Sequence, residues 1–187
     1  YVGIVFLLLI PIAGVLATSG DRRHLVAGGV FAVIGLAAGI RAVLAAGEGS
    51  LQPAGTVAAA MMIYYVFTTR RMFLHLMGAK RVTQDTLVSA ACVYLLVGLT
   101  FAFAYMWVQI DVPGAFIANT GESLIELPNL IYFSFVTLTT LGYGDIAPVA
   151  GIARSLVILE ATFGVMYLAT IISRMVSLYS SDEASTQ

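Results

Sequence analysis

Long runs of apolar residues alternate with short polar segments along the 187 residues of this chain. A helix needs about 20 apolar residues to cross the roughly 30 Å of hydrocarbon in a bilayer. Five runs suit that task and are predicted to be transmembrane helices: 1–18, 25–46, 53–69, 85–110 and 149–178. A shorter run at 128–141 cannot span. We expect it to enter the membrane and return, which is possible only where its end is buried in protein or lines a water-filled cavity.

The basic residues indicate how these spans are oriented, because loops rich in Lys and Arg stay in the cytoplasm. Arg22 and Arg23 lie between the first two predicted spans. The segment between the third and fourth spans holds Arg70, Arg71, Lys80 and Arg81. The other loops carry acidic residues, with Arg154 at the start of the fifth span as the exception. The pattern predicts an integral protein of the plasma or inner membrane, with its N-terminus outside and its C-terminus in the cytoplasm.

This orientation also bears on how the subunit begins. Because the first predicted span would start outside the cell, we expect an earlier span to precede Tyr1, as in a six-span subunit. A cleaved signal peptide is the alternative.

Composition agrees with a membrane protein. Hydrophobic residues make up 60% of the chain and charged residues 10%, against about 25% charged residues in soluble domains. The mean hydropathy is +0.97. A water-soluble fold cannot bury this much apolar surface, which excludes a soluble enzyme, a nucleic-acid-binding protein and a disordered chain. The apolar spans predict an all-α membrane protein. The sequence has no nucleophile–base pair and no nucleotide or metal motif, so we predict that the protein is not an enzyme and has no cofactor.

The candidate chemistry lies in the segment Thr139-Thr140-Leu141-Gly142-Tyr143-Gly144-Asp145, directly after the short apolar run. Pro128 suits the first turn of a helix. A helix from there to about Thr139 would point the negative end of its dipole at a cation. Gly142 and Gly144 allow backbone conformations that side chains forbid, so successive carbonyls can face one axis and replace the water shell of an ion.

Two side chains add to this interpretation. Thr140 supplies a hydroxyl oxygen at the inner end of the segment. Tyr143 can point away from the axis and pack against the preceding helix, which would hold a ring of carbonyls open.

These residues resemble the selectivity filter of the tetrameric pore-loop potassium channels, which reads Thr-Val-Gly-Tyr-Gly. Leu141 replaces Val here, and Asp145 follows as in the family. The resemblance implies a potassium-selective channel, because non-selective relatives replace the Tyr by Asp. It implies K⁺ ions bound at the filter residues Thr140, Leu141, Gly142 and Tyr143. One strand cannot enclose an ion, so the resemblance also implies a homotetramer, with K⁺ and membrane lipid as its other partners.

The resemblance divides the chain into three parts. Residues 1–83 hold three spans and a basic cytoplasmic linker. Residues 84–179 form the pore domain, with an outer helix, a turret, a pore helix, the filter and an inner helix. Residues 180–187 are a polar tail. The predicted fold is therefore five transmembrane helices plus a re-entrant pore helix and filter, assembled as a tetramer.

Residues around the filter are expected to support it. Thr139 precedes the filter, and Asp145 follows it. Some family members hold a pore-helix carboxylate that pairs with this Asp. The corresponding position here is Val136, so that pair is absent. Tyr132 retains a hydrogen-bond donor, and we expect it to reach Asp145 from behind the filter.

The inner helix carries the predicted gate. Gly164 lies at the offset from Asp145 at which the family has a glycine described as a gating hinge. Close helix packing is the alternative role for this glycine. After it, apolar residues recur at helical spacing and form one face of the helix: Val165, Leu168, Ile172 and Val176. By the resemblance we expect this face to line the cavity and the gate. Packing against the outer helix is the alternative.

Glu160 is the unexpected residue, because a carboxylate inside a membrane span is rare and usually has a partner. The pore-helix hydroxyls Ser134, Thr137 and Thr139 are the candidate partners. A structural role and a role in gating or proton sensing both remain open at this point.

The third span has no regular array of Arg residues, which a voltage sensor needs, so voltage gating is not predicted. The gating stimulus is left open. Three alternative functions also stay open: a non-selective cation channel, a non-conducting sensor or accessory subunit with the pore fold, and a potassium transporter. The transporters carry four degenerate filters in one chain, whereas this chain has a single intact one.

Overall fold

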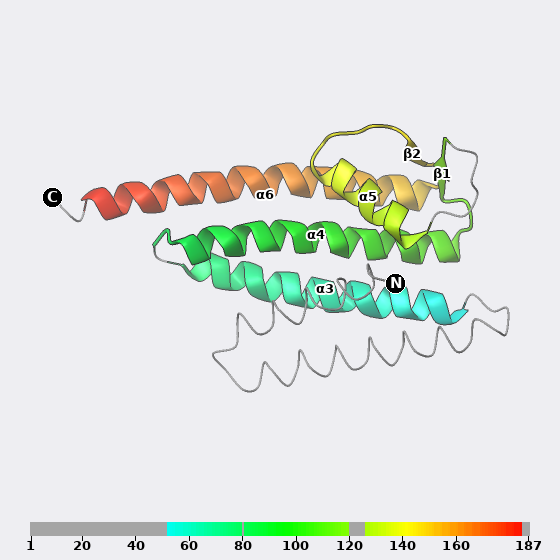
Figure 1. Cartoon of the computed structure of the whole chain (residues 1–187), viewed down its shortest axis with the longest axis horizontal. Helices are drawn as coiled ribbons and strands as arrows, with labels where there is room; N and C mark the ends of the chain where they lie inside the picture. The colour runs from blue at the N-terminus through cyan, green and yellow to red at the C-terminus, as the bar shows by residue number, and fades with distance from the viewer. Residues whose placement is uncertain (1–51, 80, 120–125, 185–187) are drawn as a thin grey trace.

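The computed structural model describes residues 52–79, 81–119 and 126–184. The first two predicted spans, at 1–18 and 25–46, lie outside these residues. The elements within them follow in the order α3 (Gln52–Gly78), α4 (Gln84–Asp111), β1 (Phe116–Ala118), α5 (Leu127–Leu138), β2 (Ile146–Pro148) and α6 (Gly151–Ala184). Figure 1 shows α4 between α3 and α6, with the short α5 beside α4 and α6 near one end.

Two of the described helices are long and apolar enough to cross a membrane. They are Gln84–Asp111 and Gly151–Ser180, which cover the fourth and fifth predicted spans. α3 covers the third predicted span but continues to Gly78, so most of the basic segment expected to be a linker is helical. α5 has 12 residues and is too short to span.

Local sequence signals set the ends of two helices. Thr83 and Thr86 form a capping box at the start of α4, in which each side chain accepts a hydrogen bond from the backbone N–H of the other residue at 3.3 Å. Pro128 occupies the first turn of α5, where its missing N–H leaves no partner unsatisfied.

Aromatic side chains pack the long helices together. Tyr65 of α3 is fully buried and stacks on Phe103 of α4, with ring centroids 5.3 Å apart. Tyr167 of α6 stacks on Tyr94 of α4 at 5.9 Å, and its hydroxyl donates to Ala90 O at 2.7 Å. The long helices are thus joined by stacked rings, and the hydroxyls of Tyr94 and Tyr167 also have hydrogen-bond partners.

An arginine of α6 closes the end of α3. Arg174 Nη2 donates to Met77 O at 2.5 Å and to Ala79 O at 3.0 Å. The last carbonyls of a helix lack intrahelical partners and carry the negative end of its dipole. Arg174 therefore supplies both a hydrogen-bond donor and a positive charge at the C-terminal end of α3, and it joins α6 to that end.

A short antiparallel sheet accompanies the helices. β1 pairs with β2 in the register Phe116 to Pro148, Ile117 to Ala147 and Ala118 to Ile146. The chain is mostly helical as predicted, but the sequence pattern did not predict this sheet. Each strand has three residues, and their pairing joins segments on either side of α5.

We expect Arg174→Ala to lower the free energy of unfolding by about 1.5–3 kcal/mol, because the carbonyls of Met77 at the end of α3 and of Ala79 just after it lose a charged donor. Denaturation of the purified protein in detergent micelles, followed by circular dichroism, measures the loss. Arg154→Ala is the matched control. Its side chain is exposed and donates from Nε to a single carbonyl, that of Pro148. An equal loss in both variants would contradict the role assigned to Arg174.

Candidate functional site

The backbone of residues 140–144 alternates in handedness. Thr140, Gly142 and Gly144 have positive φ values of 59°, 60° and 75°. Leu141 and Tyr143, which lie between them, are not among the residues with positive φ. Alternation of right- and left-handed residues places successive carbonyls on one side of a strand and successive N–H groups on the other. The segment, named here the carbonyl strand, therefore has the backbone pattern needed to present a row of oxygen ligands.

Thr140 is the strained member of this strand. Among the described residues it is the single non-glycine residue with positive φ. A left-handed conformation costs a residue with a Cβ roughly 1–2 kcal/mol. This conformation is especially rare for a β-branched residue such as Thr. Such strain persists where surrounding contacts impose it and often marks a functional site.

The contacts that impose it come from the end of α5. Its last four carbonyls have no intrahelical partners, and three of them accept hydrogen bonds from the residues that follow. The bonds run from Thr139 N to Phe135 O at 3.0 Å, from Thr140 N to Thr137 O at 2.9 Å, and from Leu141 N and Gly142 N to Val136 O at 2.9 and 3.2 Å. The N–H groups of Thr140, Leu141 and Gly142 are thereby bonded to α5, which fixes the first part of the carbonyl strand to that helix.

The fourth carbonyl is satisfied by the neighbouring helix. Tyr94 of α4 donates from its hydroxyl to Leu138 O at 2.9 Å. Thr139 supports the same helix end, since its Oγ1 donates to Phe135 O at 2.6 Å. Sequence reasoning identified Thr139 but missed Tyr94, which lies 44 residues from its partner and shares no local motif with it.

The far end of the carbonyl strand is held by the short sheet and its flanking residue. Asn119 follows β1 and donates from its backbone N to Asp145 O at 2.9 Å and from Nδ2 to Gly144 O at 3.1 Å. The Asp145 side chain accepts from Ile146 N at 3.1 Å. Asn119 was not predicted, because nothing in the sequence links it to a segment 25 residues away.

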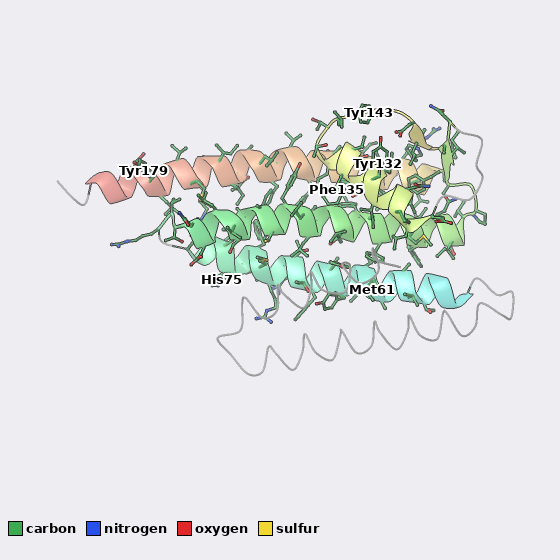
Figure 2. All side chains as sticks on the ribbon, in the orientation of Figure 1. Met61, His75, Tyr132, Phe135, Tyr143 and Tyr179 are labelled. Atoms are coloured by element: carbon green, nitrogen blue, oxygen red, sulfur yellow. The ribbon has the colours of Figure 1, made fainter. Side chains whose placement is uncertain are left out.

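Tyr132 lies on α5 close enough to Asp145 for the two side chains to interact. Desolvation raises the pKa of the Tyr132 hydroxyl above its usual value, and the hydrogen bond and charge of Asp145 raise it further. The Tyr132 hydroxyl thus keeps its proton and faces Asp145 as a potential donor. Figure 2 shows Tyr132 on α5 and Tyr143 on the loop that follows it.

The Tyr143 ring, which is expected to pack against a pore helix, is not covered within the single chain. The Tyr143 side chain is 68% exposed in the single chain, and that of Leu141 is 56% exposed. The helix of the same chain does not cover the ring, so packing within one chain does not hold the carbonyl strand open.

The inner helix approaches the end of α5 closely at Gly164. A Cβ atom at this position would lie 2.7 Å from Leu138 O and 2.9 Å from Leu138 Cδ1. Real Cβ atoms do not approach other atoms this closely, so the site requires glycine. The helix continues without a break from Gly151 to Ala184. Of the two roles considered for Gly164, close helix packing is therefore the one that the contact with Leu138 explains.

The predicted gate residues lie on the uncovered side of α6. All four have exposed side chains in the single chain: Val165, Leu168, Ile172 and Val176. They do not pack against α4, the alternative that the sequence left open.

Glu160 is fully buried where α4, α5 and α6 meet. Tyr105 of α4 donates from its hydroxyl to Oε2, and the Ser134 hydroxyl of α5 contacts Oε1. Ser134 was a candidate partner. Within the described residues Thr137 and Thr139 form no hydrogen bond with the carboxyl group, and Tyr105 was not anticipated.

Comparisons with known proteins identify related chains. A family model described as an ion channel matches residues 90–181. The chain is 32% identical to Protein LctB of Bacillus caldotenax over 128 residues, which cover 65% of this chain and 91% of that protein. It is 34% identical to Two-pore potassium channel 4 of Arabidopsis thaliana over 93 residues, or 49% of this chain and 30% of that protein. No solved structure matches the chain.

We expect Gly164→Ala to lower the free energy of unfolding by about 1–3 kcal/mol, because the added methyl group forces α6 away from α5. Denaturation in detergent micelles measures the change. The control is Gly151→Ala, since a Cβ at Gly151 meets nothing within 4 Å. A Gly164→Ala protein as stable as the control would contradict the close contact and favour a hinge.

Proposed function

The chain belongs to the pore-loop potassium channel family, and from that premise we propose that it conducts K⁺ passively and selectively across a membrane. The observation that carries the proposal is the carbonyl strand. Its alternating φ values and its N–H bonds to α5 leave a row of carbonyls with no partner within that helix. Rings of such carbonyls replace the hydration shell of K⁺ in a selectivity filter.

We propose that four copies surround the ion. A single carbonyl strand offers ligands from one side only, so a closed ring needs rotational symmetry. The exposure of Leu141 and Tyr143 supports this arrangement, because neighbouring copies would cover these side chains. The same holds for the apolar side chains exposed along α6, which include Ile158, Phe163 and Met166. Tyr143 would then pack against the pore helix of the next subunit.

The ligands for the ion would be the carbonyl oxygens of Thr140, Leu141, Gly142 and Tyr143, with the Thr140 hydroxyl at the inner end. Asp145 would lie at the outer mouth, held by Tyr132. The basic residues at the end of α3, Arg70 and Arg71, support a cytoplasmic position for that end. α3 has no regular array of Arg residues, which supports a channel without voltage gating.

Bi-ionic recording tests the proposal against a non-selective channel and a non-conducting subunit. The purified full chain is reconstituted in planar bilayers with K⁺ on one side and Na⁺ on the other. We expect a current whose reversal potential is dominated by K⁺. A reversal potential near zero would indicate a non-selective channel, and the absence of current would contradict channel activity.

We expect Gly142→Ala to abolish K⁺ current while the protein still folds. An alanine at φ +60° costs about 1–2 kcal/mol in each subunit, so the carbonyls turn away from the ion. Leu141→Val is the control, because Leu141 lies at a position without positive φ and Val keeps the apolar character. Planar-bilayer current and circular dichroism together measure the effect. Normal K⁺ current through the Gly142→Ala protein would contradict the assignment.

We propose that the exposed face of α6 forms the inner gate, since a ring of apolar side chains closes a pore by dewetting. Ile172→Asp is expected to hydrate that constriction and raise the resting conductance several-fold. Ser177→Asp serves as the control, because it adds the same charge to the same helix away from this face. Equal conductance in the two variants would place the gate elsewhere.

A further inference from the structure

A buried carboxyl group joins three helices behind the carbonyl strand. Glu160 has no exposed surface. Its two contacts in the described part of the chain are hydroxyl groups, from Tyr105 of α4 and Ser134 of α5. A buried carboxylate is costly unless a cation or several donors compensate its charge. Whether Glu160 is charged therefore depends on how many hydrogen-bond donors its neighbours direct at the carboxyl group.

The Ser134 hydroxyl has two neighbours and one hydrogen. It lies 2.7 Å from Gly98 O of α4 and also contacts Oε1 of Glu160. A backbone carbonyl can only accept, so the Ser134 hydrogen must point to Gly98 when that bond is made. The contact between Ser134 and Oε1 then requires a hydrogen from Glu160. The geometry satisfies every atom when Glu160 is a neutral acid that donates to Ser134 and accepts from Tyr105.

No other charged group competes for this site in the described residues. The titratable groups of α4 that interact with Glu160 are Tyr105 and Tyr94. α5 contributes the Ser134 hydroxyl, which does not titrate. On α6 itself, Arg154 donates to Pro148 O instead. The charge of Glu160 therefore depends on its own proton rather than on an ion pair.

Ionisation would change which helix Ser134 holds. A carboxylate at Glu160 can only accept, so the Ser134 hydrogen would turn from Gly98 O to Oε1. The hydrogen bond from Ser134 of α5 to Gly98 O of α4 would be lost, whereas the bond from Tyr94 of α4 to Leu138 O of α5 would remain. Ser134 lies two residues before Val136, whose carbonyl holds Leu141 N and Gly142 N. The change would thus act on the part of α5 that supports the carbonyl strand.

We propose that Glu160 is a proton-dependent positioning residue, which as a neutral acid preserves the hydrogen bond from Ser134 of α5 to Gly98 of α4 and on ionising breaks it, so that α5 is held less firmly and K⁺ conduction falls. The effect on conduction rests on the proposed channel function. Glu160 touches neither the ion nor its ligands and acts through Ser134 and α5.

Two measurements on the full-length protein test this inference. Infrared spectroscopy in liposomes detects the C=O stretch of a protonated carboxylic acid. Planar-bilayer recording measures K⁺ current between about pH 5 and about pH 10, a range that includes the documented titration of buried glutamates. We expect the carboxylic-acid band to vanish and the wild-type current to fall over the same pH interval.

Glu160→Gln separates proton binding from a purely structural role. Its amide can donate to Ser134 and accept from Tyr105, as the neutral acid does. We expect this variant to lack the infrared band, to conduct K⁺, and to lose the pH-dependent fall in current. Glu126→Gln is the matched control, because Glu126 is exposed at the start of α5, and it should behave as the wild type.

Three results would overturn the inference: a wild-type protein without the band at any pH, a pH response unchanged by Glu160→Gln, or a pH response lost equally in Glu126→Gln. Tyr105→Phe gives a second readout should Glu160→Gln fail to fold. It removes a donor to the carboxyl group and should shift the band, and an unshifted band would also overturn the assignment. Absence of K⁺ current at every pH would instead contradict the channel proposal, while the infrared band still reports the proton on Glu160.

Discussion

The hydrogen bonds between the C-terminal carbonyls of α5 and the residues that follow are the constraint on which the rest of the structure depends. Inside a membrane protein, backbone groups at depth must find partners within the protein. Here Val136 O receives two N–H groups, and Phe135 O and Thr137 O receive one each from the backbone. These bonds use the N–H side of the carbonyl strand and stabilise the strained Thr140. The carbonyl side is left for an ion, which the proposed function supplies.

α4 supplies the frame that keeps α5 in place. Tyr94 bonds the last carbonyl of α5, Gly98 accepts from Ser134, and Tyr105 bonds Glu160. Gly98 also allows the close approach, since a Cβ there would lie 2.8 Å from the Phe135 ring. These three residues fall on one face of the helix, at spacings that bring side chains into line. Each of the three residues holds a different part of the support, so α4 contributes to the site through α5 and Glu160.

Much of the fold and of the site was predictable because its signals are local. Hydropathy located α4 and α6, Pro128 marked the start of α5, and the glycine spacing identified the carbonyl strand. The contacts of Tyr94, Asn119 and Arg174 were not predictable, because their partners are 44, 25 and at least 95 residues away. Each donates to a backbone carbonyl, which carries no sequence signal. The packing of Tyr143 against a pore helix stays a prediction, because its ring is exposed in the single chain.

The central claim is that the carbonyls of residues 140–143 converge on an ion between four copies of the chain. Structure determination of the purified protein in Tl⁺, a heavy substitute for K⁺, tests this most directly through anomalous scattering. The account predicts a fourfold axis with a row of Tl⁺ peaks between rings of these carbonyl oxygens. A fourfold assembly whose carbonyls point away from the axis, or an assembly with no ions between them, would contradict it.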